Sequence, residues 1–179
     1  MSLLQKTMKS EKVYEGKILN LRIDTVELPN KKYSKREIVE HSGAVAIVPI
    51  IDKDKLILIK QYRKAVEDYL YEIPAGRIEI NEEPRETAIR ELIEEIGYRP
   101  KKLTYLSEFY PSPGYTNEKI QLFLGEALIA EAPDTETEEL IEVHEFTFDH
   151  VIKMIERNEI IDAKTIIGVY TAMNILTDN

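Results

Sequence analysis

Residues 76–98 read GRIEINEEPRETAIRELIEEIGY, which predicts a glycine turn, a short helix and a second glycine turn. Asn81 is placed to cap the helix with its side-chain oxygen. Pro84 falls in the first turn, where a missing backbone N–H costs nothing, and Gly97 lies where a helix commonly ends in a left-handed residue. The stretch thus marks both ends of one helix, around which the rest of the chain can be arranged.

The two faces of this helix differ in chemistry. One face is apolar and repeats with helical spacing through Ala88, Ile89, Leu92, Ile93 and Ile96. The other carries Glu91, Glu94 and Glu95, and like charges four residues apart destabilise a helix by roughly 0.2–0.5 kcal/mol. A hard divalent cation would remove that repulsion, because carboxylate oxygens are its preferred ligands. Arg90 can reach Glu86 or Glu94 and leave the other carboxylates for metal, whereas the alternative is a solvated acidic face.

The spacing of the whole stretch resembles the signature of the Nudix hydrolase superfamily. Gly76 is followed after five residues by Glu82, and after seven more by the run Arg90-Glu91-Leu92-Ile93-Glu94-Glu95-Ile96-Gly97. Only Tyr98 departs from the pattern, at a position that is normally aliphatic.

The resemblance implies an α/β/α sandwich with a mixed sheet. It also implies that Glu91, Glu94 and Glu95 form the metal-binding group, with the backbone carbonyl of Ala75 as a further ligand. The positions that it assigns to the structure of the motif are Gly76, Glu82, Arg90 and Gly97. The expected ion is Mg²⁺ or Mn²⁺, with more than one ion per site.

Composition and charge exclude several classes of protein. The formal net charge of −9 argues against binding to a nucleic-acid backbone, which needs clustered Lys and Arg. The chain has no cysteine, which removes disulfides and thiolate zinc sites and fits a reducing compartment. No apolar run approaches the roughly 18 residues of a membrane helix, and the first residues lack the apolar core of a signal peptide. We therefore expect a cytoplasmic protein with neither nucleic-acid nor membrane partners.

The rest of the chain indicates an α+β fold in two parts. In residues 1–41, Leu19, Leu21 and Ile23 alternate with polar residues as in a half-buried strand. A turn at Pro29 then leads to a second strand. So small a β unit has little core and must dock on the main domain, residues 42–179, or on a second subunit.

Strands and helices are also expected in the main domain. GAVAIVPII (43–51) is apolar enough for a fully buried strand. Further strands are expected at LILIKQYR, LTYLSEFY, IQLFLGEAL and IEVHEFTF. Asp162 is placed to cap a last helix whose apolar face carries Ile166, Ile167, Tyr170 and Met173.

Motifs outside the signature resemble the ADP-ribose pyrophosphatase branch of the superfamily. They are QYR before the signature, EIPAG at its start, PSPGYTNE behind it and the closing DAKTIIGVY, and Pro113 lies sixteen residues after Gly97, about where that branch carries a proline. The branch implies that Arg63 contacts substrate phosphates and that Arg36 approaches from the N-terminal strands. Tyr71 or Tyr115 would line the ribose or base pocket, although packing is the alternative for both.

The acidic loop at residues 131–140 is the second region to which the branch assigns function. Counting back from LIEV favours Glu139 as a metal ligand, and Thr137 stands where a general base is expected. Glu136 or Glu138 can serve by a one-residue shift, or a signature glutamate, Glu94 or Glu95, can activate water. A solvated loop is the alternative.

Together these features predict a Mg²⁺-dependent hydrolase that splits ADP-ribose into AMP and ribose 5-phosphate. One alternative is hydrolysis of another nucleoside diphosphate sugar or a dinucleotide. Another is a nucleotide sensor without catalysis. The branch also implies a homodimer whose N-terminal strands shape the substrate pocket, and pairs with two-fold symmetry are the commonest oligomers.

Overall fold

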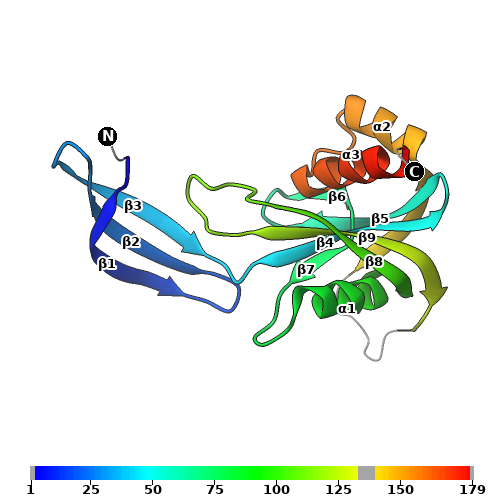
Figure 1. The fold of residues 1–179 in the computed structure, drawn as a ribbon, viewed down its shortest axis with the longest axis horizontal. Coiled ribbons are helices and arrows are strands. Elements are labelled where there is room, and N and C mark those ends of the chain that lie inside the picture. The colour runs from blue at the N-terminus through cyan, green and yellow to red at the C-terminus, as the bar shows by residue number, and fades with distance from the viewer. Residues whose placement is uncertain (1–2, 133–139, 178–179) are drawn as a thin grey trace. The chain divides into compact units, whose positions relative to one another are not determined.

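A computed structural model describes residues 3–132 and 140–177, and the chain forms two compact units (Figure 1). The first unit combines the N-terminal part of the chain up to Gly43 with the loop Tyr110–Lys119. The second contains Ala44–Phe109 and the chain from Ile120 onward.

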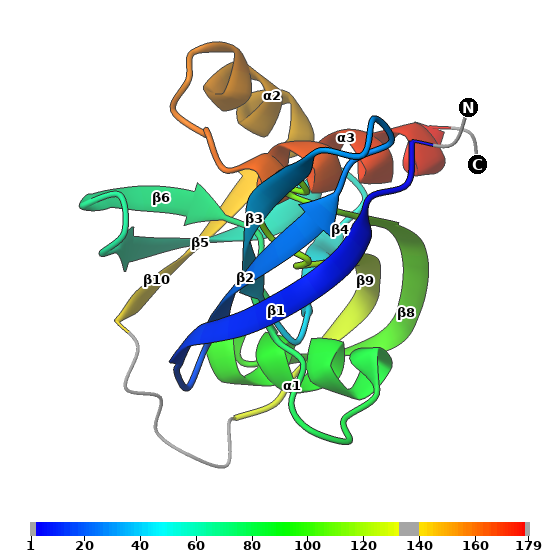
Figure 2. The same cartoon turned by 90° about the vertical axis from the view of Figure 1, so that its left-hand side faces the viewer.

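The first unit is an antiparallel sheet of three strands, seen face-on in Figure 2: β1 (Lys6–Glu15), β2 (Asn20–Glu27) and β3 (Tyr33–Glu40). The predicted turn at Pro29 joins β2 to β3. The strand β1 was not predicted, because all ten of its residues are exposed and its sequence lacks an apolar alternation. The loop Tyr110–Lys119 is attached to β3 by hydrogen bonds from Val39 N to Tyr115 O (2.8 Å) and from Asn117 N to Val39 O (3.2 Å).

The second unit is built on a mixed sheet in the order β10-β5-β4-β9-β8, with β6 paired to β5 and β7 paired to β4. Its strands are β4 (Ala44–Asp52), β5 (Lys55–Arg63), β6 (Asp68–Glu72), β7 (Ala75–Arg77), β8 (Tyr98–Phe109), β9 (Ile120–Ala130) and β10 (Ile141–Thr147). Strands β4 and β9 run parallel, whereas the other paired strands are antiparallel.

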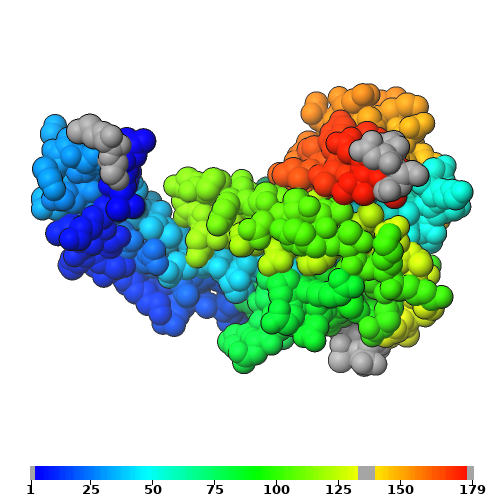
Figure 3. Space-filling model, viewed as in Figure 1, coloured from blue at the N-terminus to red at the C-terminus, as the bar shows by residue number. Residues whose placement is uncertain are grey.

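Helices cover both faces of this sheet, which confirms the predicted sandwich (Figure 1). On β4, Val45 and Ile47 point toward α1 (Pro84–Ile96), whereas Ala46 and Val48 point toward α2 (Phe148–Glu156) and α3 (Ala163–Thr177). Because side chains alternate along a strand, burial on both faces requires an unbroken apolar sequence. In Figure 3, α2 and α3 form one continuous part of the surface. No helix of the described residues is both long and apolar enough to cross a bilayer.

The ends of α1 agree with the prediction in part. Pro84 occupies the start of the helix, and Gly97 has φ 73° and donates its N–H to the carbonyl of Ile93 (3.0 Å). The predicted cap is wrong, because the N-cap residue is Glu83 and its side chain makes no capping hydrogen bond. Asn81 adopts φ 65° instead, so it forms the left-handed turn that brings the chain into the helix.

The start of α3 is capped as predicted, but its apolar face is rotated. The Oδ2 of Asp162 accepts a hydrogen bond from the N–H of Thr165 (3.0 Å). Ile166 and Met173 pack on the core, whereas Ile167 and Tyr170 are exposed. The buried positions of the helix include Thr165, Val169 and Ala172, since the surface that packs closely on the sheet needs small side chains.

Candidate active site

Two carboxylates of α1 approach the backbone of β7. The Oε2 of Glu95 accepts a hydrogen bond from the N–H of Ala75 (3.0 Å). The carboxyl of Glu91 lies so close to Gly76 that a Cβ built on that glycine would overlap it. Pairing of β7 with β4, which sets Ala46 opposite Ala75, fixes this backbone on the sheet. The helix and the strand therefore bring two acidic side chains to one short stretch of main chain.

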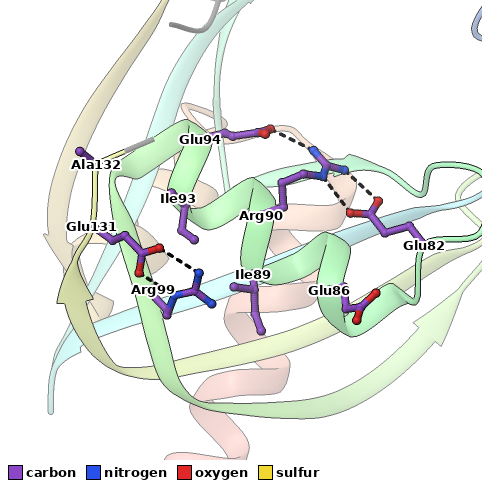
Figure 4. A pocket seen from close by; sticks show the side chains of 9 residues that line it. All are labelled: Glu82, Glu86, Ile89, Arg90, Ile93, Glu94, Arg99, Glu131 and Ala132. Atoms are coloured by element: carbon purple, nitrogen blue, oxygen red, sulfur yellow. Dashed lines mark hydrogen bonds and ion pairs between the residues drawn. The ribbon is translucent and has the colours of Figure 1, made fainter. Parts of the chain in front are cut away.

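Arg90 lies among the acidic residues and connects the helix to the loop before it (Figure 4). Its Nε and Nη2 donate to the two oxygens of Glu82 at 2.9 and 3.1 Å. Its Nη1 donates to Glu91 (2.7 Å) and to Glu94 (2.9 Å), and its Nη2 also reaches the carbonyl of Arg77 (3.3 Å). Of the two pairings predicted for Arg90, the structure contains the one with Glu94.

The hydrogen bonds from Arg90 hold Glu82 in its ionised form. They lower the pKa of Glu82 from its ordinary value of 4.5 to about 2, against a smaller opposing effect of burial. The same contacts raise the pKa of Arg90, because the guanidinium is surrounded by carboxylates. The Glu82–Arg90 pair is therefore charged across the whole range in which a protein normally works.

The chemistry of this site fits a hard divalent cation. All nearby ligand atoms are carboxylate or carbonyl oxygens, and Glu91 and Glu95 meet at Ala75 and Gly76. In the described parts of the chain, no three acidic or histidine side chains lie close enough together to hold an ion on their own. The predicted grouping of Glu91, Glu94 and Glu95 around a metal ion therefore stays a prediction.

The substrate-binding residues predicted in the second unit both have protein partners. Arg63 makes a two-point contact with the carboxylate of Glu72, with hydrogen bonds of 2.7 and 2.8 Å. The ring of Tyr71 packs edge-on against His144 and Phe146, at centroid distances of 5.6 and 5.8 Å. Tyr71 therefore has the packing role that was its alternative, and its role toward substrate stays a prediction.

The remaining predicted residues lie elsewhere. Arg36 belongs to β3 in the first unit and contacts Gln5 (3.0 Å) and Ser34 (2.8 Å). Pro113 and Tyr115 lie in the loop of that unit, and both are exposed. Glu136, Thr137, Glu138 and Glu139 lie outside the described residues, so their assigned roles stay predictions.

Sequence reasoning missed a buried polar cluster next to the site. Glu72 is only 1% exposed and contacts Lys164 as well as Arg63. Burial opposes ionisation of Glu72, but hydrogen bonds and charge from the two cations outweigh it, so its pKa is lowered. Thr165 is fully buried and accepts a hydrogen bond from the N–H of Ile73 (2.8 Å). The available signals were the glutamate of EIPAG and the polar residues of DAKT, which no apolar pattern explains.

A pocket of about 530 Å³ borders the outer side of α1. The residues that line it are Glu82, Glu86, Ile89, Arg90, Ile93, Glu94, Arg99, Glu131 and Ala132 (Figure 4). An ion pair between Arg99 and Glu131 (2.5 Å) forms one side, and the Arg90 cluster forms another. The pocket thus shares Arg90 and Glu94 with the acidic face of the helix.

Comparison with known proteins places these features in a family context. The NUDIX domain family matches residues 40–167, and the family described as nucleoside diphosphate sugar hydrolase N-terminal domain matches residues 6–39. ADP-ribose pyrophosphatase of Bacillus subtilis (strain 168) is 47% identical over 92% of this chain and 90% of its own. A methanol dehydrogenase activator of Bacillus methanolicus is 41% identical over 92% and 90%. A crystal structure of an ADP compounds hydrolase superposes with a TM-score of 0.88 at 26% identity, covering 99% of this chain and 97% of that one.

Replacing Glu82 by glutamine should make the fold less sensitive to acid. The folded-state pKa of Glu82 is about 2 and its ordinary value is 4.5, so its ionised form stabilises the fold above the ordinary pKa, and this stabilisation is lost as the pH falls toward 2. Urea unfolding at about pH 6 and about pH 3 should show that the wild type loses roughly 1–2 kcal/mol more than Glu82→Gln. Equal losses in both proteins would contradict the pairing.

Replacing Gly76 by alanine should displace the carboxylate of Glu91 and leave the fold intact. The new Cβ would meet the end of a flexible side chain, which can turn away at little cost in stability. Affinity for Mn²⁺, measured from the electron paramagnetic resonance of the unbound ion, should fall by about tenfold. Gly114→Ala is the matched control, because no atom lies within 4 Å of a Cβ built there. Wild-type affinity in Gly76→Ala would show that Glu91 does not bind the ion.

Proposed function

Because the chain belongs to the NUDIX domain family, we propose that it hydrolyses the pyrophosphate bond of ADP-ribose to AMP and ribose 5-phosphate with the help of divalent cations. The observation that carries this proposal is the meeting of Glu91 and Glu95 at the backbone of Ala75 and Gly76. The relatives named as an ADP-ribose pyrophosphatase and an ADP compounds hydrolase support the choice of substrate.

Glu91, Glu95 and the carbonyl of Ala75 would hold the cations, with Glu139 as a further ligand. Bound Mg²⁺ or Mn²⁺ would screen the charge of a diphosphate, activate a water and stabilise the leaving oxygen, and more than one ion per site is proposed. Arg90 keeps the neighbouring carboxylates in place, since it contacts both Glu91 and Glu94.

The base that takes a proton from the attacking water is proposed among four glutamates. Glu136 and Glu138 are the candidates from the acidic loop, which also contains the proposed ligand Glu139. Glu94 and Glu95 are the candidates from α1, where Glu94 is half-buried and bonded to Arg90 (2.9 Å). A glutamate held by a cation has a lowered proton affinity, which makes a loop glutamate the better base.

Several residues are proposed to contact the substrate. Arg63 carries a positive charge that suits the diphosphate, and its contact with Glu72 fixes the plane of its guanidinium. The other proposed contacts are made by Arg36, Tyr71, Pro113 and Tyr115. The side chain of Tyr115 is exposed, and its aromatic ring is proposed to stack on the adenine base.

A homodimer is proposed from the surface of the first unit. Its sheet leaves Met8, Val13, Tyr14 and Tyr33 at least half exposed, and Ile18 is exposed in the turn between β1 and β2. We propose that these side chains form the interaction surface, because apolar side chains gain free energy when a partner covers them. A second copy of the same chain is the proposed partner, since a two-fold pair buries the same surface twice.

The reaction is tested by a metal-dependent assay of ADP-ribose beside other nucleoside diphosphate sugars and dinucleotides, with products identified by mass. Dinucleotides are included because the methanol dehydrogenase activator is named for its effect on another enzyme, and this name states no substrate. The wild type should release AMP and ribose 5-phosphate, and Glu95→Gln should lose roughly 10³-fold or more in turnover while remaining folded. Glu83→Gln is the matched control, because this exposed side chain makes no capping bond. Binding of ADP-ribose without AMP release would favour a sensor, and preferred cleavage of another sugar would change the substrate.

Light scattering of the full chain at assay concentration should give twice the mass of one chain. Val13→Glu should shift the protein toward single chains, because it places a charge on an exposed apolar position of β1. A single-chain mass for the wild type would contradict the dimer. An unchanged mass for Val13→Glu would place the interface elsewhere.

A further inference from the structure

Four consecutive residues before Gly76 are each held by a different partner. The carboxylate of Glu72 contacts Arg63 and Lys164. The N–H of Ile73 donates to the hydroxyl of Thr165 at 2.8 Å, and the carbonyl of Pro74 accepts from the N–H of Ile47 at 2.9 Å. The N–H of Ala75 donates to Glu95 at 3.0 Å. The segment is therefore held at every residue, and it ends where the cations are proposed to bind.

The hydroxyl of Thr165 is oriented by the cap of α3. It donates to the Oδ2 of Asp162 at 2.6 Å, and the same oxygen accepts from the N–H of Thr165 at 3.0 Å. With its proton committed to Asp162, the hydroxyl oxygen presents a lone pair to Ile73. Lys164 also contacts Asp162 (3.1 Å), so the first turn of the helix is one connected polar cluster.

Stability of the fold alone does not explain why this polar cluster is buried. A buried ion pair seldom stabilises a fold more than apolar residues of the same size would. Glu72 is 1% exposed and Thr165 is fully buried, in a region that is otherwise packed with apolar side chains. What the cluster supplies is a fixed position for Glu72 and Ile73. The ring of Pro74 limits rotation between them and Ala75, so that position is passed on to the proposed backbone ligand.

We propose that Thr165, oriented by Asp162, is a positioning residue that sets the backbone of Ala75 for cation binding from the face of the sheet opposite to α1. The inference rests on the proposed function in one respect, namely that cations bind at Ala75. Residues that orient metal ligands without touching the metal typically change its affinity by 10–100-fold when they are removed. The loss of the Thr165 hydroxyl therefore acts on cation affinity through Ile73 and Ala75.

The test compares Thr165→Val, Thr165→Ser and Thr171→Val in the full chain. Valine has nearly the shape of threonine but cannot accept the bond from Ile73, whereas serine keeps the hydroxyl. Thr171 lies on the same helix, and its hydroxyl donates within the helix to the carbonyl of Ile167 at 2.7 Å. Mn²⁺ affinity is measured without substrate from the paramagnetic resonance of the unbound ion, and stability from urea unfolding.

Thr165→Val should bind Mn²⁺ about tenfold more weakly than the wild type at a temperature where it is fully folded. Thr165→Ser should stay within about twofold of the wild type, and Thr171→Val should match it. A lower urea midpoint for Thr165→Val is expected whenever a buried hydrogen bond is lost. The Mn²⁺ affinity, and not the stability, therefore tests the proposal. Asp162→Ala, which removes the acceptor that orients the Thr165 hydroxyl, should weaken binding in the same direction and takes the place of Thr165→Val if that variant does not fold.

Wild-type affinity in folded Thr165→Val, or equal weakening in Thr165→Ser and Thr165→Val, would overturn the inference. A wild type that binds no Mn²⁺ would instead overturn the proposed cation site. The two failures are thus distinguished by the wild-type titration alone.

Discussion

The close approach of α1 to the backbone at Gly76 is the constraint on which the rest of the structure depends. The carboxyl of Glu91 occupies the space that a side chain at Gly76 would need. Ala88 and Leu92 set this distance, because they are fully buried between the helix and the sheet. Packing of apolar residues, which has no direction of its own, thereby places charged groups against main chain. The orientation of the acidic face follows from the apolar face of the same helix.

Arg90 is a positive group surrounded by carboxylates. Its guanidinium contacts Glu82, Glu91 and Glu94, while Glu95 is held by the N–H of Ala75. Both carboxylate oxygens of Glu82 accept hydrogen bonds from Arg90, and this contact links the loop to the helix. Three carboxylates thus share the one guanidinium of Arg90. Negative charge on these carboxylates would repel a diphosphate, and the proposed cations would offset that repulsion.

Sequence patterns predicted the parts of the fold that local rules determine. Pro84 and Gly97 mark the ends of α1 because each favours one backbone conformation, and the apolar run of β4 indicated burial on both faces. Sequence patterns did not predict the features of the fold that depend on tertiary contacts. Asn81 lies in the turn next to Glu82, which is bonded to Arg90 of the helix, and β1 is held by its antiparallel pairing with β2. Glu91 and Glu95 were identified from their spacing, whereas Glu72 and Thr165 acquire partners only when α3 packs on the sheet.

A backbone ligand poses a problem that a side-chain ligand does not. The carbonyl of Ala75 has no side chain through which substitution can adjust its position, so only its neighbours can do so. Gly76 admits the helix, Pro74 restricts rotation, and Ile73 is bonded to α3. Residues of this kind look structural, since none of them carries chemistry of its own. The proposed role of the Ala75 carbonyl accounts for the buried carboxylate of Glu72 and the buried hydroxyl of Thr165 in an apolar layer, because Glu72 lies a few residues before Ala75 and Thr165 is bonded to Ile73.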